Sequence, residues 1–281
     1  MILGDFVIEQ LSEGFFELFK DGTFIKMDPS RLNEPETDPS LGRYSSALGI
    51  DPLLVLTPEM KIVIDPGLGW GLDHQSSHKN TSNVKTNLDV FDLTPEEIDV
   101  VILSHLHYDH AAGATFVANS LKTTPTFPNA KYFLHRNEWD FALSEIDNKN
   151  KPSGADYRLD ELYRLAADKR FEFIDSEQES IANGVTLIKS GGHTPGHLIV
   201  KLQSQSETAY YLGDLIPTEY HLNHYPMKLM DEDPLAAKKM KTVLLREALK
   251  EKAHLFFYHS LYKKSGRLAK DEDRRYIILE K

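Results

Sequence analysis

The segment 105–110, with the sequence His-Leu-His-Tyr-Asp-His, places three imidazoles and a carboxylate directly after the apolar run 100–103. That run is rich in β-branched residues, so it predicts a buried strand that would hold the following side chains on a rigid base. The chain contains 12 His among 281 residues, so composition does not explain such clustering. The segment therefore predicts a metal site, and a His-rich surface loop is the alternative.

Three further apolar runs also stop at His or Asp. The segment Gly-Gly-His-Thr-Pro-Gly-His at 191–197 follows one run, and two others end at Asp214 and His259. Each signal alone is weak, because a lone Gly-Asp is more often a turn. Together they predict one ion held by His105, His107 and His193, a second held by Asp109, His110 and His259, and Asp214 as a bridge between them.

This order of residues, His-x-His-x-Asp-His followed by His, Asp and His on later strands, resembles the metallo-β-lactamase superfamily over about residues 53–259. The resemblance implies the α/β (α+β) class, a four-layer αβ/βα sandwich, and a dinuclear zinc centre on the residues named above. Within the superfamily, segments 21–24, 191–197 and 213–218 and the late His259 look most like the N-acyl-homoserine lactonase and methyl parathion hydrolase branch.

The expected chemistry is hydrolysis of a lactone or carboxylic ester, with N-acyl-homoserine lactones and organophosphotriesters included. Two zinc ions would lower the pKa of a shared water from 15.7 to about 7 and supply hydroxide near neutral pH. The chain has no Cys, so nitrogen and oxygen must hold any metal, and Mn²⁺, Co²⁺ or Fe²⁺ would also accept such ligands. His107 occupies a position where the di-iron flavoprotein relatives usually carry Glu, which favours hydrolysis.

The proton donor for the leaving group is less evident. Homoserine lactonases that resemble this chain carry Tyr three residues after the bridging Asp, and here that position is Pro217. Tyr220 is therefore the candidate donor, with Asp109 and Asp214 as the other candidate catalytic residues, and His221, His224 and Tyr225 are alternatives to Tyr220. We expect His197 to support the ligands and not to be one of them.

Other members of the superfamily provide the competing hypotheses. A glyoxalase II-like thioesterase, a mononuclear iron persulfide dioxygenase and a non-catalytic ligand sensor could each use this fold. The net charge of −11 and the pI near 5.5 argue against an RNA-processing nuclease, because binding to phosphates normally requires a basic surface.

Bulk properties predict a single domain over residues 1–281, since no low-complexity linker divides the chain. No apolar stretch reaches membrane-spanning length and the N-terminus lacks a signal-peptide pattern, so we expect a cytoplasmic protein. The expected partner is a small-molecule substrate, with no nucleic acid and no membrane, and a homodimer is considered.

Local patterns predict the remaining elements. The sequence predicts a hairpin over 53–65, a short helix starting after Thr94, and a helix starting after Asp233 whose core stripe is Leu235, Met240, Val243, Leu244 and Ala248. Other strands are expected at 132–135, 171–174, 185–190, 198–202 and 208–213, and other helices at 137–145 and 156–168. The irregular segments 29–45 and 216–230 should shape the substrate pocket.

Overall fold

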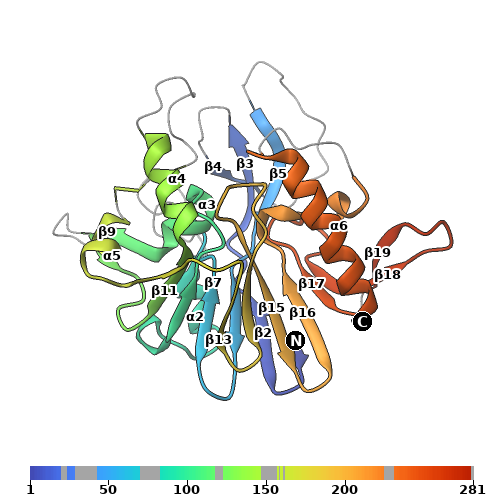
Figure 1. Ribbon diagram of the computed structural model, residues 1–281. Coiled ribbons are helices and arrows are strands. Elements are labelled where there is room, and N and C mark those ends of the chain that lie inside the picture. The colour runs from blue at the N-terminus through green and yellow to red at the C-terminus, as the bar shows by residue number, and fades with distance from the viewer. Residues whose placement is uncertain are drawn as a thin grey trace.

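The computed structural model describes residues 1–19, 24–28, 43–69, 83–117, 123–146, 157, 159–160, 162–224 and 231–279. Two seven-stranded sheets form its centre, with α4 and α6 on opposite outer sides of the strands (Figure 1). The first sheet has the order β1 (Ile2–Leu3), β2 (Phe6–Gln10), β6 (Leu53–Leu56), β7 (Lys61–Ile64), β8 (Val100–Ile102), β11 (Lys131–His135) and β12 (Phe171–Ile174). The second has the order β13 (Gln178–Ala182), β14 (Val185–Lys189), β15 (Leu198–Ser204), β16 (Glu207–Tyr211), β17 (His254–Phe256), β18 (Ser265–Lys270) and β19 (Tyr276–Leu279).

Smaller elements complete the fold. A three-stranded sheet has the order β4 (Phe24–Lys26), β3 (Gly14–Phe19) and β5 (Arg43–Ile50), and β9 (Thr115–Val117) pairs with β10 (Thr123–Pro125). The α-helices are α2 (Val84–Asp89), α3 (Tyr108–Ala111), α4 (Arg136–Ile146), α5 (Tyr163–Ala167) and α6 (Pro234–Lys250). The 3₁₀ turns are η3 (Pro95–Glu97), η4 (Ala112–Ala114), η5 (Gly213–Leu215) and η6 (Glu219–Leu222). Among the described helices, none combines the length and the hydrophobicity needed to cross a lipid bilayer.

Three hydrophobic clusters separate four layers. The central cluster joins the inner faces of the two sheets, for example Ile62 and Ile102 with Leu187 and Tyr211. A second cluster packs the first sheet against α2, α4 and α5, and a third packs the second sheet against α6. This arrangement is the expected αβ/βα sandwich, because each sheet buries one face against its partner and the other against helices.

Strand direction brings the predicted ligands to one edge. Strands β7, β8 and β11 run parallel, and β16 runs parallel to β17, so the carboxyl ends of neighbouring strands meet. Strand β14 is antiparallel to β15, which is antiparallel to β16, so β14 also ends on the side where β16 ends. The loops after β8, β14, β16 and β17 carry the predicted ligands.

Most local predictions are confirmed. The 53–65 hairpin is the antiparallel pair β6 and β7, and Thr94 caps η3 with the expected capping box to Glu97. The predicted strands correspond to β11, β12, β14, β15 and β16, and the helix predicted at 137–145 is α4. Residues 29–42 and 225–230 lie outside the described part of the chain, while 43–45 belong to β5.

Two predictions need correction. Among the described residues of the helix predicted over 156–168, the α-helical ones are those of α5, and Tyr157 instead forms an antiparallel β-bridge with His107. The buried face of α6 consists of Ala237, Lys241, Leu244, Leu245 and Ala248. Leu235 and Val243 are 62% and 49% exposed, contrary to the predicted stripe. Leu235 precedes Leu244 by nine positions, and at about 100° per residue this places it half a turn away from the buried face.

Candidate metal centre

The first group of predicted ligands converges as expected. The Nε2 atom of His105 lies 3.0 Å from Nδ1 of His107, and Nε2 of His193 lies 3.1 Å from the same Nδ1. His105 and His193 are buried, and His107 is half-buried. The loop after β8 and the loop after β14 thus bring three imidazole nitrogens to one point that solvent can still approach.

The second group forms beside it. The Nε2 atoms of His110 and His259 are 3.2 Å apart, and Oδ2 of Asp109 lies 3.5 Å from Nε2 of His259. His110 and His259 are buried at this position, and Asp109 is half-buried. Both groups have the composition and spacing needed to hold a metal ion.

Asp214 faces both groups with different oxygens. Its Oδ1 atom lies 3.4 Å from Nε2 of His110 and 3.2 Å from Nε2 of His259, whereas Oδ2 lies 3.4 Å from Nε2 of His193. The short Asp side chain at the start of η5 therefore spans the space between the groups. This geometry agrees with the bridging position that the sequence predicts.

The donor set fits a transition metal. A tetrahedral zinc ion with Zn–N distances of about 2.0 to 2.1 Å requires ligand nitrogens about 3.3 Å apart. The separations of 3.0 to 3.2 Å among the imidazole nitrogens are close to this requirement. Imidazole and carboxylate ligands suit zinc, but they also suit cobalt, manganese and iron.

The electrostatics separate the two groups. Burial and the neighbouring imidazoles hold the pKa of His105 and of His107 well below the usual range, so both present lone pairs. Burial opposes a charge on His110, but Asp109 and Asp214 outweigh it and raise the pKa of His110 to about 10. A cation bound at the second group would take the place of that proton, so metal uptake there should release it.

Most ligand rings are held at the nitrogen that faces away from the centre. Nδ1 of His110 lies 2.8 Å from Oδ2 of Asp65, and Nδ1 of His193 lies 3.2 Å from Oδ1 of Asp231. Nδ1 of His259 donates to the Gly49 carbonyl at 2.8 Å. Partners of this kind fix the orientation of a ligating imidazole and increase its basicity.

Asp65 links several parts of the centre. Besides contacting His110, it accepts hydrogen bonds from the Ser104 backbone and hydroxyl at 2.6 and 2.5 Å and from the Tyr211 hydroxyl at 2.7 Å. Burial raises the pKa of Tyr211 well above its usual value, so the phenol remains a donor. Tyr258 stacks on the His110 ring, with centroids 4.0 Å apart, and donates to the Asp109 carbonyl at 2.6 Å.

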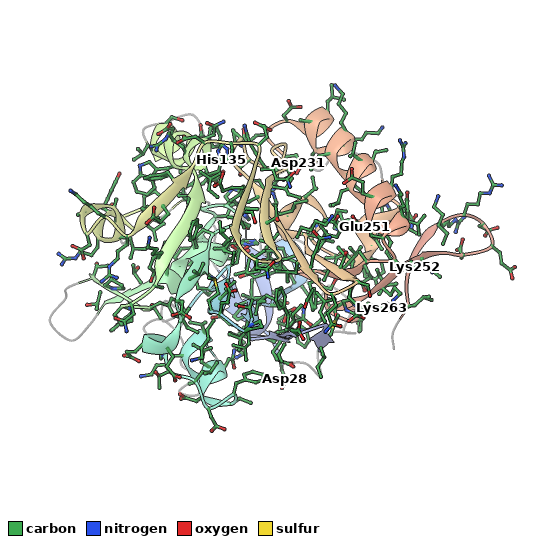
Figure 2. The ribbon with its side chains drawn as sticks, turned by 60° about the horizontal axis from the view of Figure 1, so that its bottom comes forward. Asp28, His135, Asp231, Glu251, Lys252 and Lys263 are labelled. Atoms are coloured by element: carbon green, nitrogen blue, oxygen red, sulfur yellow. The ribbon has the colours of Figure 1, made fainter. Side chains whose placement is uncertain are left out.

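The 191–197 segment has two of its glycines, Gly192 and Gly196, at positions without room for a side chain. Gly192 has a φ of +82°, and a Cβ there would lie 2.4 Å from the Ala237 backbone nitrogen at the start of α6. The Gly192 carbonyl accepts from the Asp233 N–H, and the His193 carbonyl accepts from the Glu232 N–H. Figure 2 labels Asp231, which lies close to the beginning of α6. The turn thus fixes His193 against the segment that carries Asp231.

His197 occupies a supporting position. Its Nε2 atom accepts from the Asp214 N–H at 2.9 Å, and its Nδ1 atom lies 2.6 Å from the Ser190 hydroxyl. Both ring nitrogens therefore have partners within the protein. This arrangement agrees with the prediction that His197 supports the ligands and is not one of them, and the structure adds that its contact is with the Asp214 backbone.

Tyr220 is a predicted site residue, but none of its contacts in the described part of the chain is with either ligand group. It lies in η6 and is 60% exposed. Pro217 is buried, and its carbonyl accepts from the His259 N–H at 2.9 Å, so it supports a predicted ligand through its backbone. The role of Tyr220 as proton donor stays a prediction, and so do the roles of Asp109 and Asp214 in catalysis.

Sequence reasoning missed the buried carboxylates around the centre. The sequence prediction includes Asp65 only as the last residue of the 53–65 hairpin, although Asp65 also follows an apolar run, the signal that identifies Asp214 and His259. Asp231 and Glu138 have no such signal, because neither follows an apolar run. Glu138 lies in the first turn of α4 and is fully buried.

Comparison with known proteins places these observations in a family. The profile of the Metallo-beta-lactamase superfamily matches residues 48–279. An N-acyl homoserine lactonase of Bacillus sp is 26% identical over 174 residues, which cover 61% of this chain and 60% of the lactonase. The endoribonuclease YSH1 of Mycosarcoma maydis is 26% identical over 179 residues, which cover 61% of this chain and 20% of that protein.

Solved structures share the fold over the full chain. A probable metal-dependent hydrolase from Staphylococcus aureus has a TM-score of 0.75 at 23% identity, covering 100% of this chain and 99% of the other. AidC, a dizinc quorum-quenching lactonase in complex with the product N-hexanoyl-L-homoserine, has a TM-score of 0.73 at 22% identity, covering 100% of this chain and 97% of AidC. The profile match, the four-layer fold and the order of His and Asp residues at one sheet edge lead to one assignment. The chain belongs to the metallo-β-lactamase superfamily.

Proposed function

We propose that this protein is a dinuclear zinc-dependent hydrolase of lactones or carboxylic esters. The observation that carries the proposal is the position of Asp214, whose two oxygens face separate groups of His ligands. A single-metal enzyme would not need the complete second group of Asp109, His110 and His259. Relatives described as N-acyl homoserine lactonases support the substrate class, although the match spans about 60% of their length.

Each part of the centre has a role in this proposal. Two zinc ions, when bound, would lower the pKa of a water to about 7 and polarise a substrate carbonyl. Asp214 would hold the two ions at a fixed separation, and Asp109 would complete the second site as a ligand. Tyr220, from η6, would deliver the proton to the leaving group after moving toward the centre. We expect N-acyl-homoserine lactones, linear esters and organophosphotriesters to be the informative substrates.

The proposed hydrolase acts on a small molecule and not on nucleic acid. A net charge of −11 favours a small-molecule substrate over nucleic acid, although one relative is an endoribonuclease. A cytoplasmic location and a homodimer stay predictions.

The proposal is tested by metal analysis and a substrate panel. Protein purified without chelator and supplemented with zinc should contain about two zinc ions per chain. It should hydrolyse at least one lactone or ester, with activity rising between about pH 6 and 8 as the water ionises. In oxygen-18 water, the label should enter the product carboxylate, because the acyl–oxygen bond is the one that breaks.

The panel also includes a thioester and a persulfide. Preferred cleavage of the thioester would favour the glyoxalase II-like alternative. One iron per chain, together with oxygen consumption on persulfide and no hydrolysis, would replace the proposal with the dioxygenase. Ligand binding without turnover of any substrate would favour a sensor.

A further inference from the structure

Two separate loops supply the first ligand group, so the spacing of its imidazoles depends on contacts between these loops. His105 and His107 come from the loop after β8, whereas His193 comes from the loop after β14 in the other sheet. Helix α4 begins directly after β11, and its first turn carries Glu138, which is fully buried.

The carboxylate of Glu138 is bound to both loops. Its Oε1 atom accepts the Leu106 N–H at 3.0 Å, and Leu106 lies between the ligands His105 and His107. Its Oε2 atom accepts the Thr194 hydroxyl at 2.5 Å, and Thr194 follows the ligand His193. Hydrogen bonds to a carboxylate are stronger than neutral ones, and water does not compete at this buried position.

Backbone packing leaves the two loops little freedom around this carboxylate. The Gly196 backbone also hydrogen-bonds to Glu138, and a Cβ on Gly196 would lie 2.2 Å from the Glu138 nitrogen. The Tyr157 hydroxyl lies 3.5 Å from Oε1, and the Tyr157 ring lies beside His107 with centroids 4.9 Å apart. The start of α4 is therefore in direct contact with the parts of the chain that determine where the three imidazoles stand.

The second ligand group is supported by different residues. Asp65 contacts His110, and Gly49 accepts from His259. Within the described part of the chain, Glu138 forms hydrogen bonds with Leu106, Tyr157, Thr194 and Gly196, and its partners do not include Asp109, His110 or His259. An effect of Glu138 on metal binding should thus be confined to the first group.

We propose that Glu138 is a positioning residue that sets the spacing between the His105–His107 loop and the His193 loop, and thereby the metal affinity of that group. The inference rests on the proposed dinuclear centre. Glu138 does not touch the metal position or the substrate, so it acts through the ligands.

The test measures the two metal sites separately. Zinc affinity is determined by competition with a chromophoric chelator, and the Co²⁺ absorption spectrum reports ligand geometry. Glu138→Ala should weaken one binding step by about 10- to 100-fold, the range found for residues that orient metal ligands. The other step should stay unchanged, and the Co²⁺ spectrum at the weakened site should change.

Further variants separate positioning from general stability. Glu138→Gln keeps the shape but accepts on one atom only, so its effect should be intermediate. Thr194→Val removes a single hydroxyl, should weaken the same step less, and should add little to Glu138→Ala because both break one network. Asp140→Asn is the matched control, since Asp140 is an exposed carboxylate of the same helix.

These measurements distinguish a positioning role of Glu138 from a general effect on stability. Equal weakening of both steps with a lower urea midpoint, or unchanged affinity and spectrum in both Glu138 variants, would overturn the inference. If Glu138→Ala does not fold, Glu138→Gln and Thr194→Val decide the question by the same criteria. If the wild-type protein itself does not bind two ions, the proposed function fails before the role of Glu138 is addressed.

Discussion

Replacing Glu13 by Gln should change how the stability of this protein depends on pH. Glu13 is fully buried, and its two oxygens accept the N–H groups of Leu68 and Gly69 at 2.8 and 3.0 Å. The loop it holds lies beneath the centre, where Gly67 donates to the His110 carbonyl and accepts from the Gly113 N–H. Burial raises the pKa of Glu13 from 4.5 to about 8, and these N–H groups only partly oppose the change.

The direction in which stability changes with pH follows from proton binding by Glu13. Because the folded-state pKa lies above that of the unfolded chain, the folded protein binds the proton more tightly. The resulting stabilisation is fully present below about pH 4.5 and is lost as the pH rises through about 8. Between about pH 6.5 and 9, stability falls only up to the folded-state pKa of about 8, which is a span of about 1.5 pH units. Each pH unit corresponds to about 1.4 kcal/mol. The expected decrease in the free energy of unfolding is about 2 kcal/mol.

Glutamine resembles the protonated carboxyl and does not titrate, so the variant lacks this decrease. The NH₂ group of its amide cannot accept a hydrogen bond from the backbone N–H that it faces. This loss lowers stability by an amount that does not depend on pH. The assay is urea unfolding of zinc-saturated wild type and Glu13→Gln at about pH 6.5, 7.5 and 9. The variant should gain about 2 kcal/mol relative to wild type across this range. Parallel curves, with a change below about 0.5 kcal/mol, would refute the reasoning.

Three further substitutions test the centre. Asp214→Ala should reduce bound zinc from about two ions to one or none and lower turnover by about 100-fold or more; a variant with near wild-type turnover would contradict the bridging role. Asp231→Asn should weaken zinc binding about 10- to 100-fold, because the carboxylate 3.2 Å from His193 is lost. Competition with a chelator measures the zinc affinity, and Asp233→Asn is the nearby control. Tyr220→Phe should lower kcat at least about 10-fold on substrates with poor leaving groups while zinc content stays constant. An unchanged kcat would assign proton delivery to solvent or to another residue.

The sequence alone identifies the candidate ligands because metal chemistry depends on residue type. His105, His107, Asp109 and His110 occupy one short segment, and an apolar run before each later ligand predicts the strand that delivers it. The structure places these side chains within reach of one another, as the motif order predicts. Capping chemistry is equally local, so η3 begins where Thr94 and Pro95 predict.

Tertiary structure alone decides which residues support the ligands. Asp65, Glu138 and Asp231 contact partners that are 45, 32 and 38 positions away, so the sequence does not show which ligand each of them supports. The orientation of α6 is decided in the same way, since Leu235 and Val243 are apolar but face solvent. Residue type determines what a side chain can bind, whereas its neighbours are determined only when the two sheets pack together and bring distant segments to one edge.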